Sequence, residues 1–220
     1  MKRLLPFIIV VLVAVATLAG AALLYRSMSS PTLTISKEKA AAEVAAGAHI
    51  RGPVDAPVTL EEFGDFQCPP CGGLAEPIKQ IEKDYEKHLR VIFRHYPFPI
   101  HEHAMEAAFA AEAAGRQDRF WEMHDLLYRE QGGWSKSPDA RLLFQAYAKM
   151  LGLDLERFKE DMESEQVKER VVHDQERGRS IGITSTPTIF INDRAVPPTS
   201  LNPAALRAAI DAAIKPKPAS

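Results

Sequence analysis

Hydrophobic and polar positions divide the chain into a βαβ unit, a helical segment and a closing ββα unit. The apolar stretches 58–63 and 90–96 each predict a strand, and apolar residues at helical spacing between them predict a helix. These positions are Leu74, Ile78, Ile81 and Tyr85. Pro77 lies inside this helix and should kink it. Two strands joined by a helix in one sheet imply a parallel pair with a right-handed crossover.

The pattern over 101–181 is helical throughout. An alanine-rich run over 103–114 predicts one helix, and Asp118 is expected to cap the next. Ser137 followed by Pro138 predicts the cap and the first position of a further helix. Asp154 predicts another cap, so this segment is an all-helical insertion.

The chain then returns to strands. Residues 188–191 and 194–196 predict a hairpin with a polar turn between them, and Asn202 with Pro203 predicts the cap and start of a final helix. The resulting order, β-α-β, helical insertion and β-β-α, indicates an α/β fold interrupted by a helical domain.

The N-terminal pattern is different. Lys2 and Arg3 precede an apolar run over 4–25, whose residues at ~1.5 Å each reach roughly 33 Å and can cross a ~30 Å hydrocarbon core. Positive charge ahead of the run keeps that end in the cytoplasm and exports the rest. We expect an uncleaved membrane-spanning anchor, because the run exceeds the ~7–15 residues of a signal-peptide core. Small residues at 19–22 leave a cleaved signal peptide as the alternative.

The predicted organisation has six parts. They are a signal-anchor helix over 1–26, a linker over 27–50, the first part of the α/β domain over 51–100, the helical insertion over 101–181, the second part of the α/β domain over 182–214 and a tail over 215–220.

Composition and net charge change this picture little. The formal net charge is −2, which gives no basic surface for nucleic acid. Without Lys2, Arg3 and Arg26, 24 of the 27 basic residues remain against 29 acidic ones, so the exported part carries −5. Export places this part where disulfides persist.

The candidate chemistry lies in Cys68-Pro69-Pro70-Cys71, which holds both cysteines of the sequence. The four residues follow the first predicted strand of the βαβ unit and open its helix. A thiolate at a helix N-terminus is stabilised by unpaired N–H groups and the helix dipole. The three-residue offset puts the second sulfur within disulfide reach on the first turn. We predict a redox pair in which Cys68 is the nucleophile and Cys71 resolves the mixed disulfide.

Two other interpretations of the cysteine pair, a structural disulfide and a metal site, have less support in the sequence. A structural disulfide closing so short a loop constrains the unfolded chain little. A closed zinc site needs four ligands, and His101 and His103, two apart on a helix, do not share a face. His95 and His124 are expected at a strand end and at a helix surface or packing position. We therefore predict no metal, and no cofactor besides the redox-active disulfide.

Four segments together carry a family resemblance. They are A-P-V-T-L-E-E-F-G-D-F-Q-C-P-P-C (56–71), R-H-Y-P-F (94–98), F-W-E-M-H-D-L-L-Y (120–128) and G-I-T-S-T-P-T-I-F-I-N (182–192). In combination they resemble the DsbA-like branch of the thioredoxin superfamily, extracytoplasmic thiol–disulfide oxidoreductases. The resemblance covers about 50–214 and implies a thioredoxin-like fold with an inserted helical domain.

The resemblance also implies roles for residues outside the cysteine pair. It implies that Pro187 is cis after Thr186, lies against the cysteines and offers backbone groups to an extended substrate segment. It implies that Glu62 is buried beneath the pair and moves protons during exchange. Glu61 stands where the family usually has an apolar residue. A solvated acid on an edge strand is the alternative for Glu62.

The residues between the cysteines bear on the direction of electron flow. The well-studied oxidases of this family carry Pro-His there, whereas this chain has Pro69 and Pro70, and Pro70 offers neither a donor nor a charge. A proline before the second cysteine is also found in reducing thioredoxins, so we expect a less extreme oxidant. Phe66, just ahead of the pair, is expected to contribute to an apolar patch for clients.

The function expected from these observations is the introduction or exchange of disulfides in exported proteins with thiols. The partner implied for reoxidation is a membrane quinone-linked thiol oxidase, with the catalytic domain on the periplasmic side of a bacterial membrane. A periplasmic reductase or isomerase is the neighbouring alternative. A non-enzymatic metal- or client-binding module is the alternative of another class.

Overall fold

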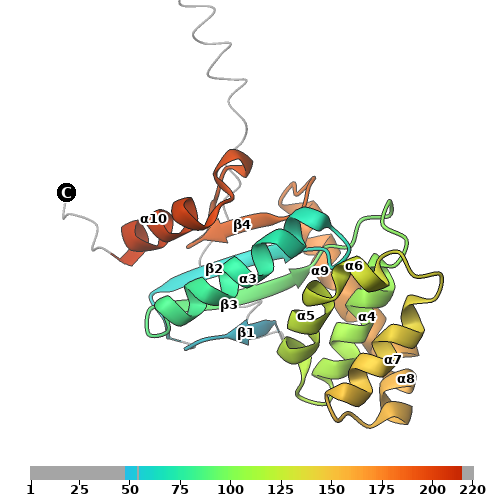
Figure 1. Ribbon diagram of the computed structural model, residues 1–220. Coiled ribbons are helices and arrows are strands. Elements are labelled where there is room, and N and C mark those ends of the chain that lie inside the picture. Colours follow the sequence, from blue (N-terminus) through green and yellow to red (C-terminus); the bar gives the residue numbers. More distant parts are fainter. Residues whose placement is uncertain (1–47, 54, 215–220) are drawn as a thin grey trace, which may run out of the picture. The chain divides into compact units, whose positions relative to one another are not determined.

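The computed structural model describes residues 48–53 and 55–214, which fold around a five-stranded sheet of order β1-β3-β2-β4-β5 (Figure 1). The strands are β1 (His49–Arg51), β2 (Val58–Gly64), β3 (Leu89–His95), β4 (Thr188–Ile191) and β5 (Arg194–Ala195). β2 and β3 are parallel, as the βαβ pattern predicts, and the other neighbours are antiparallel. The central strand β2 delivers the chain to the cysteine pair.

Strand β1 has no counterpart in the sequence prediction, which places residues 49 and 50 in the linker. It pairs antiparallel with β3, His49 opposite Phe93 and Arg51 opposite Val91. Three residues are too few to show the alternation that identifies a strand. The folded domain therefore begins earlier than the pattern indicates.

Helices cover both faces of the sheet. α3 (Pro69–Asp84) and α10 (Pro203–Ile214) pack on one face, and α9 (Glu165–Ser180) packs on the other (Figure 1). The core of the first face includes Val58, Leu60, Ile78, Ile81, Leu206 and Ile210. The core of the second includes Phe63, Tyr96, Ile183 and Phe190. β2 thus has an α3 face and an α9 face, and its side chains alternate between them.

The predicted helical insertion is confirmed between β3 and β4. Its helices before α9 are α4 (Ala104–Gly115), α5 (Phe120–Arg129), α6 (Gln131–Trp134), α7 (Ala140–Met150) and α8 (Leu155–Glu163). α4 is buried around most of its circumference, and alanine at most buried positions lets its neighbours approach closely. A short 3₁₀ turn, Pro198–Ser200, precedes α10.

Two predicted helix caps are wrong. α7 begins after Asp139, whose carboxylate accepts a hydrogen bond from the Leu142 N–H at 3.3 Å. The Ser137 hydroxyl instead accepts from the Asp139 N–H in the preceding turn. Asp118 has a positive φ of 59° and lies in the turn before α5, where Arg119 is the cap residue. Both helices therefore begin later in the chain than the residue types indicate, α5 at Phe120 and α7 at Ala140.

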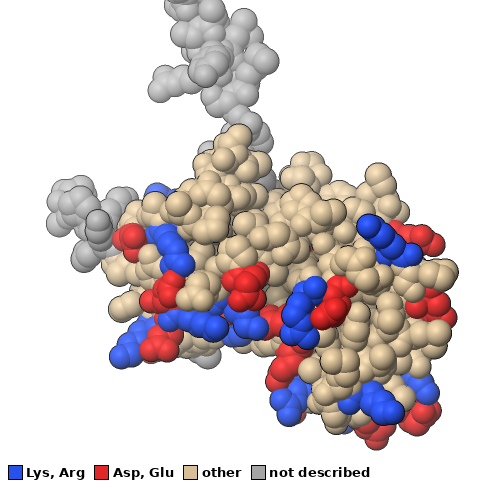
Figure 2. Space-filling model, viewed as in Figure 1, with Lys and Arg blue, Asp and Glu red and all other residues tan. Residues whose placement is uncertain are grey.

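Within the described ranges, no helix is long and apolar enough to cross a membrane. The predicted anchor over 4–25, most of the linker and the tail over 215–220 lie outside those ranges. On the face shown in Figure 2, acidic and basic side chains of the described residues are interspersed over α3 and α5. A mixed surface of this kind is typical of a solvated protein face.

Candidate active site

The two cysteines lie where β2 passes into α3. Cys68 immediately precedes the helix with an extended backbone, and Cys71 lies on its first turn. Cys68 is 5% exposed and Cys71 is 0% exposed, so Cys68 is the sulfur that a partner can reach. Both are free thiols in this structure. The Cys68–Cys71 disulfide therefore stays a prediction for the oxidised protein.

The loop that leads into β4, the strand beside β2, meets Cys68. The Thr186–Pro187 peptide bond is cis, as the resemblance implies, and the Cys68 thiol donates a hydrogen bond to the Thr186 carbonyl oxygen at 3.4 Å. A groove lies between this loop and the start of α3. It is lined by Pro70, Leu74, Thr186, Pro187 and Leu201, among others. The predicted substrate loop and the predicted nucleophile thus share one surface.

The surroundings of Cys68 favour its thiolate. A hydrogen bond with the Cys71 side chain is the largest influence, burial opposes it, and hydrogen bonds with the Thr186 side chain and with the Cys71 backbone add to it. Together they lower the pKa of Cys68 to about 6. Pro69 and Pro70 occupy the first two positions of α3 and have no N–H. The N–H of Cys71 is therefore the first backbone donor that the helix can offer to the sulfur.

Cys71 has the opposite environment. Burial raises the pKa of the Cys71 thiol well above its ordinary value, and the hydrogen bond to Cys68 raises it further. At neutral pH the pair consequently holds one thiolate, on Cys68, and one thiol, on Cys71. This asymmetry is what a nucleophilic and a resolving cysteine require.

Glu62 is buried on the α3 face of β2, the face it shares with Leu60. Burial raises the pKa of Glu62 to about 8, with further contributions from the charges of Glu82 and Cys68, while Arg51 opposes them. Its Oε1 atom has no hydrogen-bond partner among the described residues. At neutral pH Glu62 is thus a neutral acid that carries a proton close to the thiols. The alternative of a solvated acid on an edge strand is wrong, because β2 is central.

Glu61 points to the α9 face and is also buried. Its Oε1 accepts hydrogen bonds from Arg94 Nε at 2.9 Å and from Arg177 Nη2 at 3.0 Å. Arg94 also donates to Asp174 on α9 at 3.1 Å. The departure of Glu61 from the family pattern is therefore accommodated by a buried ion-pair network that joins the sheet to α9.

Side chains that the sequence prediction did not assign hold the loop before Cys68. One carboxylate oxygen of Asp65 accepts from the Gln67 N–H at 2.8 Å, and the other accepts from the Phe98 N–H at 2.9 Å. His101 Nδ1 lies 2.6 Å from the same Asp65 oxygen. His103 Nε2 instead contacts the Ser137 carbonyl at 2.9 Å. His101 and His103 lie before α4 and not on a helix, and each fixes a different segment.

Phe66 does not form a surface patch, so this expectation is wrong. Its side chain is buried and stacks on Phe93 with ring centroids 5.1 Å apart. Tyr128 and His124 of α5 also contact the Phe66 ring. A residue beside a reactive cysteine looks accessible in the sequence, but here the helical insertion covers it.

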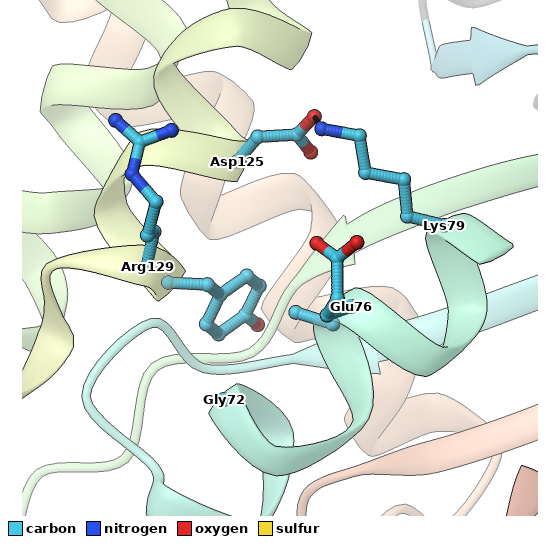
Figure 3. A pocket seen from close by; sticks show the side chains of 7 residues that line it. Gly72, Glu76, Lys79, Asp125 and Arg129 are labelled. Atoms are coloured by element: carbon cyan, nitrogen blue, oxygen red, sulfur yellow. Dashed lines mark hydrogen bonds and ion pairs between the residues drawn. The ribbon is translucent and has the colours of Figure 1, made fainter.

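A second hollow lies between α3 and α5 (Figure 3). Lys79 points at Asp125 of α5, and its Nζ donates to Asp125 Oδ2 at 2.6 Å. Arg51 of β1 also pairs with Asp125, at 3.1 Å, and with Glu82 of α3. These ion pairs join β1, α3 and α5. Because the opposite charges neutralise one another, the hollow favours no ligand of one sign.

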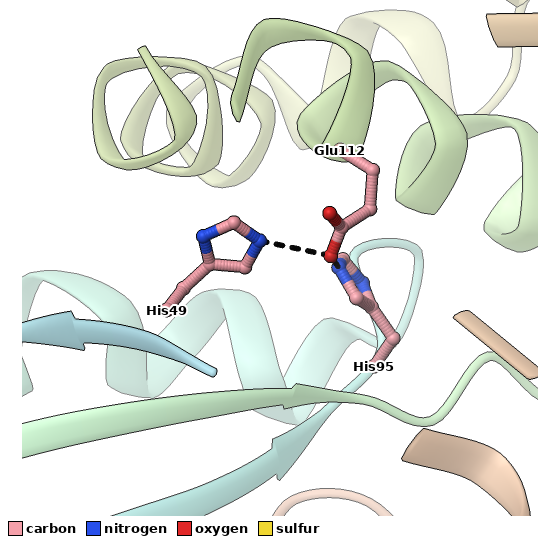
Figure 4. A group of neighbouring side chains, drawn as sticks. All are labelled: His49, His95 and Glu112. Atoms are coloured by element: carbon pink, nitrogen blue, oxygen red, sulfur yellow. Dashed lines mark hydrogen bonds and ion pairs between the residues drawn. The ribbon is translucent and has the colours of Figure 1, made fainter. Parts of the chain in front are cut away.

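A cluster of His49, His95 and Glu112 joins β1 and β3 to α4 (Figure 4). Both Nε2 atoms lie close to the same oxygen, Glu112 Oε1, at 2.9 Å from His49 and 2.8 Å from His95. The potential ligand atoms lie within 4.8 Å of one another, so this is the set in the described ranges that could hold a metal. The observed distances are those of hydrogen bonds, and Arg170 approaches the same oxygen to 3.9 Å. We assign the cluster a structural role.

Comparison with known proteins agrees with this geometry. A family model described as thioredoxin matches residues 45–212. BdbD from Bacillus subtilis has a similar structure, with a TM-score of 0.67, 28% identity, and coverage of 76% of this chain and 93% of that one. A thioredoxin-like oxidoreductase from Silicibacter pomeroyi gives a TM-score of 0.64 and 29% identity over 76% and 91% of the two chains. The thiol-disulfide exchange protein alpha-DsbA2 from Wolbachia pipientis shares the fold at 20% identity, with a TM-score of 0.64 over 75% and 86% of the two chains.

Curated relatives carry a different name. The Na(+)/H(+) antiporter NhaA 1 of Salinispora arenicola is 42% identical over 147 residues, which are 66% of this chain and 22% of the antiporter. This chain thus spans about a fifth of the length of such relatives. The family model, in contrast, covers the whole domain that contains the cysteine pair and the cis-proline loop. The chain belongs to the thioredoxin family, and it shares its fold with BdbD and with the thiol-disulfide exchange protein alpha-DsbA2.

Proposed function

We propose that the protein is an extracytoplasmic dithiol oxidase that introduces disulfides into exported proteins through Cys68 and Cys71. The observation that carries the proposal is the asymmetry of the pair. Cys68 meets the cis-proline loop and has a lowered pKa, whereas Cys71 is buried and stays protonated. A structural cysteine pair does not need such an asymmetry.

The exchange proceeds in two displacements. A client thiolate attacks Cys68 Sγ of the oxidised pair, forms a mixed disulfide and releases Cys71 as a thiolate. A second client thiolate attacks the client sulfur of that mixed disulfide, which closes the client disulfide and releases the Cys68 thiolate. Two electrons pass from the client to the protein. In this scheme Glu62 gives its proton to Cys71 and takes it back when the pair is reoxidised.

The groove beside Cys68 supplies the client site in this scheme. An extended client segment would lie along Thr186 and Pro187, and its cysteine would face the Cys68 sulfur. Leu74 and Leu201 give the groove an apolar wall, which suits the apolar side chains of an unfolded client.

The environment of Cys68 supports an oxidant of intermediate strength. Its pKa of about 6 lies between the ~3.5 of strongly oxidising pairs and the ~7 of thioredoxin. A more stable thiolate favours the reduced protein and makes the disulfide more oxidising. Pro70 offers no side-chain donor to the thiolate, which agrees with a value above the lower limit.

The proposal includes a location and a redox partner. The predicted anchor over 4–25 would hold the domain on the periplasmic side of a bacterial membrane, or in the periplasm after cleavage. A membrane quinone-linked thiol oxidase would accept the two electrons. Antiport is not part of the proposal, because the antiporter relatives are matched over 22% of their length.

One experiment tests the redox assignment and its direction. The dithiol is equilibrated with glutathione buffers of known ratio, and the absorbance of the Cys68 thiolate is followed with pH. We expect a potential well above the ~−270 mV of thioredoxin and a thiolate pKa close to 6.

A potential near that of thioredoxin with a pKa near 7 would reject the oxidase and favour the reductase or isomerase. A pair that never cycles would reject all redox functions. In that case client binding that survives Cys68→Ser would identify a holding module.

A further inference from the structure

The Gln131 side chain, at the start of α6 in the helical insertion, reaches the backbone on both sides of Gln67. Its Nε2 donates to the Phe66 carbonyl at 2.7 Å and to the Cys68 carbonyl at 2.9 Å. These two bonds use both N–H groups of the amide. Gln131, which lies 63 residues from Cys68 in the sequence, thereby ties the helical insertion to the residue that carries the nucleophilic sulfur.

The first turn of α3 is shaped to admit this amide. A Cβ added at Gly72 would lie 2.6 Å from Gln131 Oε1 and 3.0 Å from its Cδ, closer than non-bonded atoms pack. Gly72 also donates the first helical hydrogen bond of α3 to the Cys68 carbonyl at 3.1 Å. The Cys68 carbonyl thus receives one bond from its own helix and one from the insertion.

Fixing the Cys68 backbone matters more here than in a helix with a full set of donors. Pro69 and Pro70 remove two of the N–H groups at the start of α3. The stabilising contacts of the thiolate are consequently few: the side chain and N–H of Cys71, and the side chain of Thr186. Each contact depends on the backbone of Cys68 keeping its position relative to the first turn.

A second amide strengthens the same link. Gln67 Nε2 donates to the Ser135 carbonyl just after α6 at 3.1 Å, and Gln67 Oε1 accepts from the His103 N–H at 2.6 Å. The loop that precedes Cys68 is therefore held by the insertion from both ends of α6. The insertion acts on the redox centre through the backbone and does not contact the sulfurs through these bonds.

We propose that Gln131 is a positioning residue, which clamps the Cys68 backbone so that the sulfur stays against the Cys71 N–H and the cis-proline loop. This deepens the proposed function and rests on it. The helical insertion is then a part of the redox centre and not just a cover over it. The strength of the oxidant depends in part on an amide that lies outside the thioredoxin-like domain.

The test replaces the amide with groups that cannot donate. Gln131→Glu keeps the shape but points carboxylate oxygens at two carbonyls, and Gln131→Ala removes the side chain. We expect both variants to raise the pKa of Cys68, with about a tenfold change in thiolate equilibrium for a shift of one unit. The equilibrium with glutathione should shift by a similar factor toward the protein disulfide, which makes the variants weaker oxidants.

Gln117→Glu is the matched control. Gln117 is also a side-chain amide of the insertion. Its Nε2 donates to the Asp154 carbonyl and its Oε1 accepts from the Asp154 N–H, but it does not contact the cysteine loop. Its variant should keep the wild-type thiolate pKa and potential. Circular dichroism and thermal unfolding establish that each variant is folded.

Two results overturn the inference. Folded Gln131→Glu and Gln131→Ala variants with wild-type thiolate pKa and potential would show that the clamp does not position the sulfur. An equal shift in Gln117→Glu would show that any loosening of the insertion has the same effect. A wild-type pair that fails to cycle with glutathione would reject the proposed function instead, and the thiolate titration would still decide the role of Gln131.

Discussion

Two adjacent acids on β2 lie in opposite electrostatic environments. Glu61 accepts hydrogen bonds from two buried arginines, Arg94 and Arg177. Glu62 is buried with one oxygen that lacks a partner among the described residues, and its pKa is raised to about 8. Strand alternation sends the two side chains to opposite faces of the sheet. The same carboxyl group therefore stabilises the fold at one position and weakens it at the next.

Replacing Glu62 by Gln should stabilise the reduced protein at alkaline pH. Between the ordinary pKa of 4.5 and the folded value of about 8, the folded protein keeps a proton that the unfolded chain has lost. The free energy of unfolding therefore falls as pH rises through this interval, by several kcal/mol at about 1.4 kcal/mol per pH unit. Glu62→Gln removes this loss, so urea unfolding should give equal stability near pH 4.5 and a clear gain near pH 8.

Glu61→Gln is the matched neighbour and should have the opposite effect. It removes a negative charge from between two buried guanidinium groups, which destabilises by about 3 kcal/mol. Stabilisation in both variants, or a Glu62→Gln gain that does not depend on pH, would contradict the assignment of the two environments.

At the scale of elements, β1 and α4 join the sheet to the helical insertion. The link is Glu112, whose carboxylate is bonded to His49 and His95. Burial opposes the ionisation of Glu112, but the hydrogen bonds from the two histidines outweigh it and hold its pKa well below the usual range. His49 also stacks on Phe120 of α5, with ring centroids 3.4 Å apart. The strand missing from the sequence prediction is thus fixed by side-chain chemistry.

Removal of the Glu112 carboxylate should weaken the packing of the sheet against α4. Glu112→Ala leaves the buried His95 and the half-buried His49 imidazoles without their partner, so we expect a loss of about 2–4 kcal/mol in the free energy of unfolding, measured in urea. Glu106→Ala on the same helix is the control, because the Glu106 side chain is 32% exposed and its pairs with His103 and Arg141 are worth at most about 1 kcal/mol. Similar losses in the two variants would exclude the structural role of the cluster.

Sequence patterns identified elements with their own periodicity or caps. The strand over 58–63, the Asp154 cap and the Asn202 cap all appear in the structure. Predictions from sequence patterns failed where contacts between residues distant in the sequence determine the structure. β1 depends on pairing with β3, and Phe66 is buried by α5. The cysteine pair could be located from spacing, and Thr186 and Pro187 from resemblance. Gln131 had no local signal, because its role depends on where α6 packs.

At the scale of the whole molecule, the redox state of the pair should control stability. In the reduced protein the folded state holds Cys68 as a thiolate with a pKa of about 6, below the ordinary 9.0. This contribution to stability is fully present above pH 9.0 and is lost as pH falls through about 6. The oxidised protein lacks it, and its short disulfide loop stabilises little.

The reduced protein should therefore unfold at a higher temperature than the oxidised protein, and the difference should grow as pH rises from about 6 to 9. Calorimetry of the two forms across this range measures it. Cys68→Ser serves as the control, since its melting temperature should lack the thiolate-linked rise with pH. An oxidised form that is the more stable one at pH 8 would show that the thiolate is not stabilised by folding.

The alternation of Glu61 and Glu62 along β2 has a consequence for folding fidelity. β2 lies between β3 and β4, with Glu61 opposite Ile92 and Glu62 opposite Phe93 on β3. A slip of one residue would exchange the two faces of the strand. A slip in one direction would place Leu60 in the position of Glu61 and remove that carboxylate from Arg94 and Arg177. A slip in the other direction would place Glu61 among the apolar side chains around Leu60. Each mispaired alternative is penalised by several kcal/mol of buried, uncompensated charge, so the two acids select the strand register in which the thiols and their proton donor meet.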